Sequence, residues 1–158
     1  MNKSFDEIIN NLRIAQDFGK REFKIDNILQ PGIIKEMIMA GILNHQIIPT
    51  KRDPDAMDSD GNYYEYLSSI VRETMNNKGS SFQIDRITSN NLSRITRNKC
   101  FYFGFFKDNL NILEIWKVET SEILKEANRQ LKSCKNNIAH VNFLTSWVLK
   151  NGIKVYPF

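Results

Sequence analysis

The chain has 158 residues, of which 41% are hydrophobic and 11% aromatic, with only two cysteines. A chain of this size buries a core without disulfides, and no apolar run approaches the roughly 20 residues that span a bilayer, so composition excludes a disulfide scaffold and a membrane protein. The net charge of +4 favours an anionic partner such as nucleic acid without identifying one. We expect a soluble, cytoplasmic protein with a single domain over residues 1–158.

Residues 1–46 are expected to be helical. The apolar spacing that follows Ser4 predicts a helix over residues 5–18, with Gly19 as its stop. A second helical pattern follows Pro31 and ends near Gly41. Two helices therefore precede the first strand, which we expect at Ile47 and Ile48.

Residues 47–118 are expected to supply the sheet. Residues 62–71 are rich in tyrosine and β-branched side chains, which favours a strand, and residues 76–81 have loop composition. Residues 100–106 and 110–118 flank a turn and predict a hairpin. Its first arm is apolar on both faces, which is typical of a central strand.

Residues 119–158 are expected to form helices and a closing strand. Ser121 begins a helical pattern that runs to about Lys132, residues 141–149 are interpreted as a further helix, and residues 153–156 as a strand. The whole pattern predicts an α/β fold, with a mixed central sheet flanked by helices.

Five carboxylates lie within thirteen residues: Asp53, Asp55, Asp58, Asp60 and Glu65. Glu65 falls on a predicted strand, where a charge is costly unless it is paired or bound to a cation. A helix-loop-helix calcium site is excluded because Ala56 and Leu67 would occupy ligand positions. An Asp at a strand start and a Glu on the next strand can hold a divalent cation at one sheet end, as phosphodiester hydrolysis requires. Asp58 and Asp60 are interpreted as turn residues beside Gly61.

The segment from Lys78 to Lys99 is basic. It contains Arg86, Arg94 and Arg97, and Asp85 is its only acid. Such a segment can follow a phosphate backbone, and the alternative is an ordinary solvated surface.

The carboxylate segment resembles a known signature. Pro54-Asp55, nine residues and then Glu65-x-Leu67 resembles the PD-(D/E)xK nuclease motif, and residues 55–68 resemble the metal-binding segment of the PvuII-type restriction endonucleases. The likeness continues more thinly along most of the chain in the same order. It implies a restriction-endonuclease-like core, a homodimer formed through the N-terminal helices, and Mg2+ held by Asp55, Glu65 and the carbonyl of Tyr66. The implied activity is type II cleavage of double-stranded DNA at a specific, palindromic site.

The resemblance also implies which residues contact DNA. Thr88, Ser89, Asn90 and Asn91 fall where the family carries a DNA-reading strand, although histidines stand there in the family, so the recognition sequence cannot be transferred. Asparagine can bind adenine through two hydrogen bonds, and Ser or Thr can contact base edges or phosphate. We expect phosphate contacts from the cations of the basic segment, namely Arg94, Arg97 and Lys99.

Leu67 departs from the family pattern, because the third position of the motif is usually a catalytic lysine. An apolar side chain there would point into a charged, wet site and gain little burial. Three explanations remain open: an engineered Lys-to-Leu exchange that blocks cleavage, another cation such as Lys78 or Arg72, or a protein that binds DNA without cutting it. A structure-specific repair nuclease of the same superfamily is a further alternative.

Overall fold

The computed structural model describes residues 3–50, 53–71 and 81–158, with side chains from residue 6 onward. In chain order the elements are α1 (Lys3–Phe23), α2 (Pro31–Leu43), β1 (Gln46–Ile47), β2 (Ala56–Met57), β3 (Tyr63–Ile70), β4 (Ser81–Ile87), α3 (Ser93–Thr96), β5 (Asn98–Phe106), β6 (Ile112–Glu119), α4 (Thr120–Ser133), β7 (Ala139–Leu144), α5 (Thr145–Asn151) and β8 (Ile153–Tyr156). None of the helices in these ranges has the length and apolar character needed to cross a membrane.

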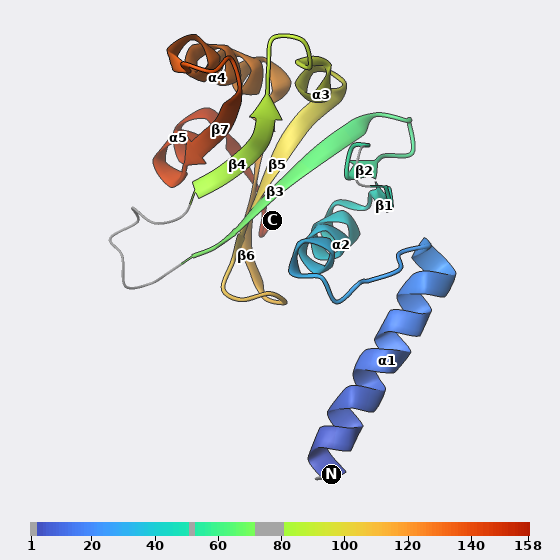
Figure 1. Ribbon diagram of the computed structural model, residues 1–158. Helices are drawn as coiled ribbons and strands as arrows, with labels where there is room; N and C mark the ends of the chain where they lie inside the picture. Colours follow the sequence, from blue (N-terminus) through green and yellow to red (C-terminus); the bar gives the residue numbers. More distant parts are fainter. Residues whose placement is uncertain (1–2, 51–52, 72–80) are drawn as a thin grey trace.

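Six strands form the main sheet in the order β1-β2-β3-β5-β6-β8, and β4 pairs with β7 in a separate two-stranded sheet. Strands β3 and β5 are parallel, whereas the other neighbours in the main sheet are antiparallel. The predicted mixed sheet is therefore confirmed. The predicted hairpin is β5 and β6; β5 is one of the two middle strands of the sheet, and β6 lies between β5 and the edge strand β8 (Figure 1).

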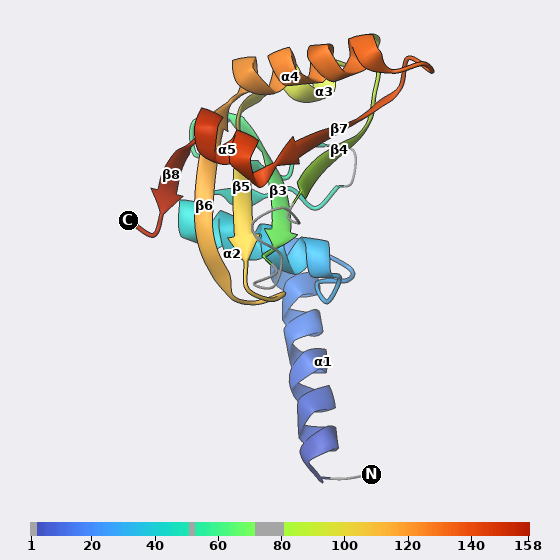
Figure 2. The ribbon, with the colours of Figure 1, turned by 90° about the vertical axis from the view of Figure 1, so that its left-hand side faces the viewer.

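Helices flank the main sheet on both sides (Figures 1 and 2). Helix α2 covers one face, where Met39 packs against a cluster that contains Tyr64, Tyr66 and Ile115. The opposite face is covered by β4, β7, α4 and α5. The core on that side is a second cluster, whose fully buried members include Phe82, Phe101, Phe103, Ile123, Val141, Phe143 and Val148.

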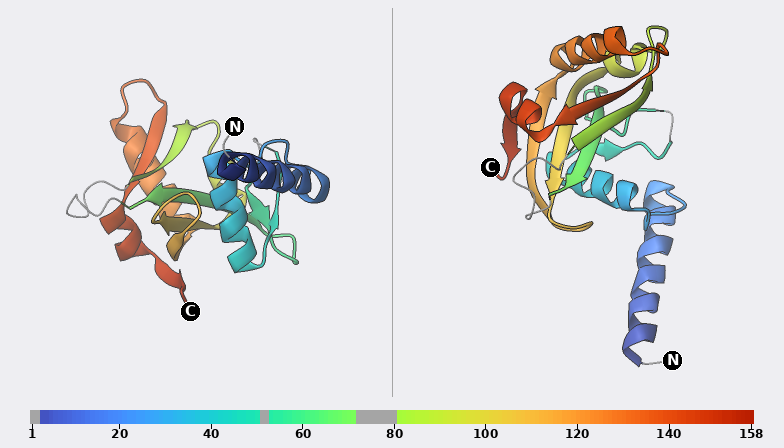
Figure 3. Two further views of the ribbon diagram at one scale, coloured as in Figure 1. Left: turned by 90° about the horizontal axis from the view of Figure 1, so that it is seen from below. Right: turned by 60° about the vertical axis from the view of Figure 1, so that its left-hand side comes forward.

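Helix α1 projects away from this body (Figures 1 and 3). The prediction that Gly19 ends the helix is wrong, because α1 continues to Phe23. Gly19 is instead a point of close approach, because a Cβ there would collide with Cγ2 of Ile28. Gln16 fixes the same segment, since its amide nitrogen donates to the Asp26 carbonyl at 2.8 Å and its oxygen accepts from the Ile28 amide at 3.1 Å.

The predicted helix over residues 141–149 is also wrong in its first half. Residues Ala139–Leu144 form β7, which pairs with β4, and only then does α5 begin. Ala139, Val141 and Phe143 are buried while the residues between them are exposed. This alternation has the period of a strand that is covered on one face, and it outweighs the helical reading of a short apolar run.

Candidate active site

Asp55 covers an edge of β3. Strand β2 pairs with β3 only through Ala56 with Tyr64 and Met57 with Tyr63. Asp55 extends this pairing, because its amide donates to the Tyr64 carbonyl at 3.0 Å and its Oδ2 accepts from the Tyr66 amide at 2.7 Å. In a strand, the N–H and C=O groups of every second residue, here Tyr64 and Tyr66, point to the same edge of the strand. The carbonyl of Tyr66 therefore faces the edge that carries the Asp55 carboxylate.

The turn between β2 and β3 holds Asp55 in this place. The Asp58 carboxylate accepts hydrogen bonds from the amides of Asp60 and Asn62, from the Asn62 side chain, and from the Tyr64 hydroxyl at 2.6 Å. Gly61 has φ +81°, a conformation that side chains disfavour. The hydrogen bond from Tyr64 and the others lower the pKa of Asp58. The predicted turn role of Asp58 is confirmed.

Glu65 lies on the face of β3 opposite Tyr64 and Tyr66. Its side chain is 20% exposed, and Nη2 of Arg97 lies 4.0 Å from its Oε2. Among the described residues no group donates a hydrogen bond to Oε2, although this oxygen is buried. A buried carboxylate oxygen without a donor is costly, so Oε2 is suited to bind a cation.

The two carboxyl groups influence each other. Burial, repulsion from Glu65 and repulsion from Glu36 raise the pKa of Asp55 well above its usual range, although the Tyr66 amide and Arg97 oppose the shift. Burial raises the pKa of Glu65 to about 7, against the attraction of Arg97 and Arg94. Buried, mutually repelling carboxylates gain stability when a cation binds between them.

Glu36 is a third carboxylate near the site, and the sequence analysis missed it. It lines a cavity of about 270 Å³ together with Asp55, between α2 and the segment that follows β1. Burial raises the pKa of Glu36, and its charge in turn raises the pKa of both Asp55 and Glu65. A signal was present, because Glu36 is the only acid in helix α2, which is apolar apart from Glu36 and the neighbouring Lys35.

Leu67 follows Glu65 on the same face, as the period of the strand predicts. The expectation that it would gain little burial is wrong. Leu67 is half-buried and packs against the core cluster that contains Phe82 and Phe103. The side chain of Leu67 is therefore surrounded by apolar residues of the core. It supplies no positive charge where the family motif usually has a lysine.

A family model for the restriction endonuclease PvuII matches residues 1–156. The chain belongs to the PvuII restriction endonuclease family. It is thus a type II restriction endonuclease, a DNA-binding deoxyribonuclease. No curated protein sequence matches the chain at a stringent significance level.

The segment expected to read DNA in this endonuclease is a turn, which corrects the expectation of a strand. Strand β4 ends at Ile87, and residues 88–91 connect it to α3. Asn91 stabilises this turn: its Oδ1 accepts from the Thr88 amide at 2.8 Å and its amide nitrogen donates to the Arg86 carbonyl at 2.9 Å. Ser89 and Asn90 are exposed at the tip, and Thr88 is half-buried.

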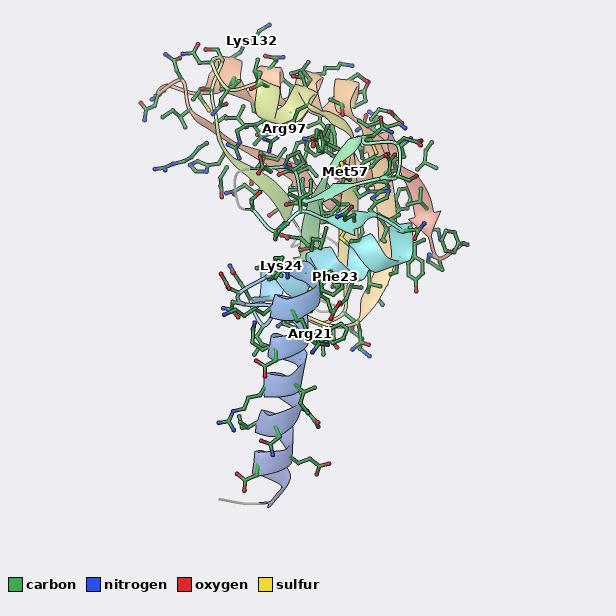
Figure 4. All side chains as sticks on the ribbon, turned by 90° about the vertical axis from the view of Figure 1, so that its right-hand side faces the viewer. Arg21, Phe23, Lys24, Met57, Arg97 and Lys132 are labelled. Atoms are coloured by element: carbon green, nitrogen blue, oxygen red, sulfur yellow. The ribbon has the colours of Figure 1, made fainter. Side chains whose placement is uncertain are left out.

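The expected phosphate contacts have different surroundings. Arg94 donates from Nη1 to the Asp85 carbonyl at 2.8 Å, which ties α3 to β4. Lys99 is exposed. Arg97 directly follows α3 and is nearest to the carboxylates, and Figure 4 shows it beneath that helix. The alternative cations Arg72 and Lys78 lie outside the described residues.

The site offers oxygen ligands of the kind that a hard divalent cation binds, although the number of these ligands is small. No group of three His, Cys, Asp or Glu side chains at metal-binding distance occurs in the described ranges. A metal here would rely on two carboxylates, a backbone carbonyl and water, which is a usual set for Mg2+. The Oε2 of Glu65, buried without a donor in this part of the chain, supports that fit.

Proposed function

We propose that this endonuclease hydrolyses phosphodiester bonds of double-stranded DNA at a specific palindromic site, with Mg2+ as cofactor. The observation that carries the proposal is the buried Oε2 of Glu65, to which no described residue donates a hydrogen bond, on the strand whose edge is covered by Asp55. Both carboxyl groups have raised pKa values because of burial, and Asp55 is raised further by repulsion from Glu65. Among the described residues this is the arrangement that best matches hydrolysis assisted by a metal ion.

Asp55, Glu65 and the carbonyl of Tyr66 would hold the metal. When bound, Mg2+ lowers the pKa of an attacking water and offsets the charge on the phosphate. The protein's own contribution is geometric. The Tyr66 amide orients Asp55 through a 2.7 Å hydrogen bond, and the turn built on Asp58 fixes the approach of β2 to β3.

Residues 88–91 are the proposed reading segment, with the exposed tip as its main part. Ser89 and Asn90 are accessible, whereas Asn91 is engaged by the turn itself. Asn90→Ala should therefore weaken discrimination between sites while fold stability is retained. Asn91→Ala should reduce both discrimination and stability, because the Thr88 amide loses its acceptor. Binding assays against matched and mismatched duplexes, with thermal melts, separate the two effects.

A homodimer formed through the N-terminal helices, within residues 1–46, is the proposed assembly. Four exposed apolar side chains of α1 support it, in two pairs spaced four residues apart: Ile8 with Leu12, and Ile14 with Phe18. Such exposure on a projecting helix is expensive in a monomer. A twofold dimer suits a palindromic site because each subunit reads one half. Light scattering should give twice 18.5 kDa, and Ile14→Glu should lower that mass.

A DNA-binding protein without turnover is the second candidate, and Leu67 is the observation that favours it. Gel-shift assays with a pool of short palindromes in Ca2+, followed by transfer to Mg2+, test both candidates. Selection of one palindrome followed by its cleavage supports the endonuclease. Selection without cleavage supports the binding protein, and preference for branched DNA would contradict both.

A further inference from the structure

Arg97 places a permanent positive charge beside the carboxylates. Its Nη2 lies 4.0 Å from Oε2 of Glu65, and the arginine side chain is 29% exposed. The spacing is that of a loose ion pair. One side of the guanidinium thus faces the proposed metal site, and the partial exposure leaves it within reach of a bound phosphate.

The backbone around Arg97 is firmly held. Its amide donates to the Ser93 carbonyl at 3.0 Å, which closes α3. The next residue, Asn98, is only 3% exposed and donates from its side chain to the Arg94 carbonyl at 2.9 Å. The Thr120 hydroxyl donates to the Asn98 carbonyl at 2.7 Å.

The pairing of β3 with β5 brings Arg97 toward Glu65. Tyr63 pairs with Asn98 but Tyr64 pairs with Cys100, so Lys99 is an extra residue in β5 at this point. Such a bulge bends a strand and redirects the side chains beside it. Arg97, just before the start of β5, therefore stands next to the strand end that carries Glu65.

Because Leu67 carries no charge, it cannot supply the positive charge that the usual lysine supplies. A guanidinium group can take over this role in part. In the hydrolysis, water oxygen bonds to phosphorus and one ester P–O bond breaks; one water proton ends on the departing oxygen and the other stays on the phosphate or leaves to solvent. Negative charge builds on the phosphate oxygens in between, and a fixed cation stabilises it. Arginine is always charged and its planar donors match two phosphate oxygens, although it cannot act as a base.

We propose that Arg97 is a catalytic residue that binds the scissile phosphate and supplies the positive charge that position 67 lacks. The inference rests on the proposed function. It goes beyond a general phosphate contact, because it assigns Arg97 to the reacting group. The geometry supports it, since Nη2 of Arg97 lies 4.0 Å from Oε2 of Glu65, one of the proposed metal ligands.

The test compares Arg97→Met, Arg97→Lys and the double variant Arg97→Met with Leu67→Lys. Arg129→Met is the matched control, because Arg129 also pairs with a carboxylate, Glu126, but lies on the exposed surface of α4. Single-turnover cleavage in Mg2+ should fall about 100-fold or more in Arg97→Met, the size expected for one lost charge-stabilising donor. Arg97→Lys should retain part of the rate, Leu67→Lys should restore it, and Arg129→Met should cleave like the wild type.

Calcium binding without DNA supplies a readout that cleavage does not. At pH 8.5, loss of a neighbouring cation should leave Ca2+ affinity unchanged or increase it severalfold, because that cation no longer repels Ca2+. Arg97→Met should therefore bind Ca2+ at least as tightly as the wild type and melt at a similar temperature. A joint loss of Ca2+ binding, thermal stability and cleavage would mean a merely structural role and overturn the inference.

The remaining outcomes distinguish the inference from the proposed function. If the wild type and Arg97→Met cleave equally, Arg97 is not catalytic and the proposed function stands. If the wild type selects a duplex without cutting it but Leu67→Lys cleaves, the chain has no substitute cation: the inference fails, and the non-cleaving binding protein replaces the endonuclease. If neither protein cleaves or selects any duplex, the proposed function fails and the inference fails with it.

Discussion

The two faces of β3 differ in how completely their polar groups are satisfied. On the face toward α2, the His45 ring stacks on Tyr64 with ring centroids 4.2 Å apart, and His45 Nδ1 is 2.7 Å from the Tyr66 hydroxyl. The Tyr64 hydroxyl in turn donates to Asp58. On the other face, Oε2 of Glu65 has no donor among the described residues, and Leu67 packs into the core.

This contrast separates stability from function. On the tyrosine face, the hydroxyls of Tyr64 and Tyr66 each have a hydrogen-bond partner, and these contacts fix the strand and the turn that holds Asp55 at its edge. The Glu65 face retains a buried carboxylate that Arg97, 4.0 Å away, compensates only in part. Proteins tolerate such local conflict where a ligand relieves it.

The largest expected effect follows from removing the carboxylate at the strand edge. Asp55→Ala should reduce Mg2+-dependent cleavage of plasmid DNA by at least about 100-fold, because it removes a metal ligand. Asp60→Ala is the control, since Asp60 is an exposed acid of the same segment. Equal cleavage by wild type and Asp55→Ala would contradict the assignment.

Protons should compete with the metal on the Glu65 face. The pKa of Glu65 is raised to about 7, so its carboxylate is mostly protonated below that pH. At subsaturating Mg2+, cleavage should rise about tenfold per pH unit below 7 and level off above it. Initial rates measured between pH 5.5 and 8.5 check this, and a flat profile would show that Glu65 stays ionised throughout.

Removing one of the repelling charges should stabilise the metal-free protein. A carboxyl group with a raised folded-state pKa binds its proton longer in the folded than in the unfolded chain, so its contribution to stability is lost as pH rises through the folded pKa. Asp55→Asn should therefore increase the free energy of unfolding at pH 8 and change it much less at pH 3, below the pKa of an unfolded aspartate. Urea unfolding at both pH values measures this difference; destabilisation at pH 8 would contradict it.

The smallest effect is expected on the tyrosine face. His45→Phe keeps a stacked ring but removes the partner of the Tyr66 hydroxyl, which should cost about 1 kcal/mol of stability. Cleavage should change by less than about threefold, because Asp55 keeps its own bond to the Tyr66 amide. A cleavage loss as large as that of Asp55→Ala would show that the two faces are not separable.

Periodicity and motif spacing were sufficient for much of the fold. The helix after Pro31, the central hairpin and the alternation of Glu65 and Leu67 against Tyr64 and Tyr66 all follow local rules. The prediction for residues 139–144 failed because a short apolar run fits a helix as well as a strand. The strand with which these residues pair, β4, is distant in sequence. The prediction that Gly19 ends the helix failed because this glycine serves a tertiary contact: it makes room for the side chain of Ile28.

The site was predictable where its residues are close in the chain. Asp55 and Glu65 share a short segment with a recognisable spacing, and the turn between them brings Asp55 to the strand edge. Glu36 and the pairing of Arg97 with Glu65 were not predictable, because they depend on the packing of α2 and on the bulge at the start of β5.

Calorimetric titration of the metal-free protein with Ca2+ at pH 8, comparing wild type, Asp55→Asn and Glu65→Gln, tests the shared metal site most directly. The account predicts saturable binding by the wild type and its loss in both variants, because each carboxylate supplies a ligand to the same cation. Unchanged Ca2+ binding in either variant would contradict it.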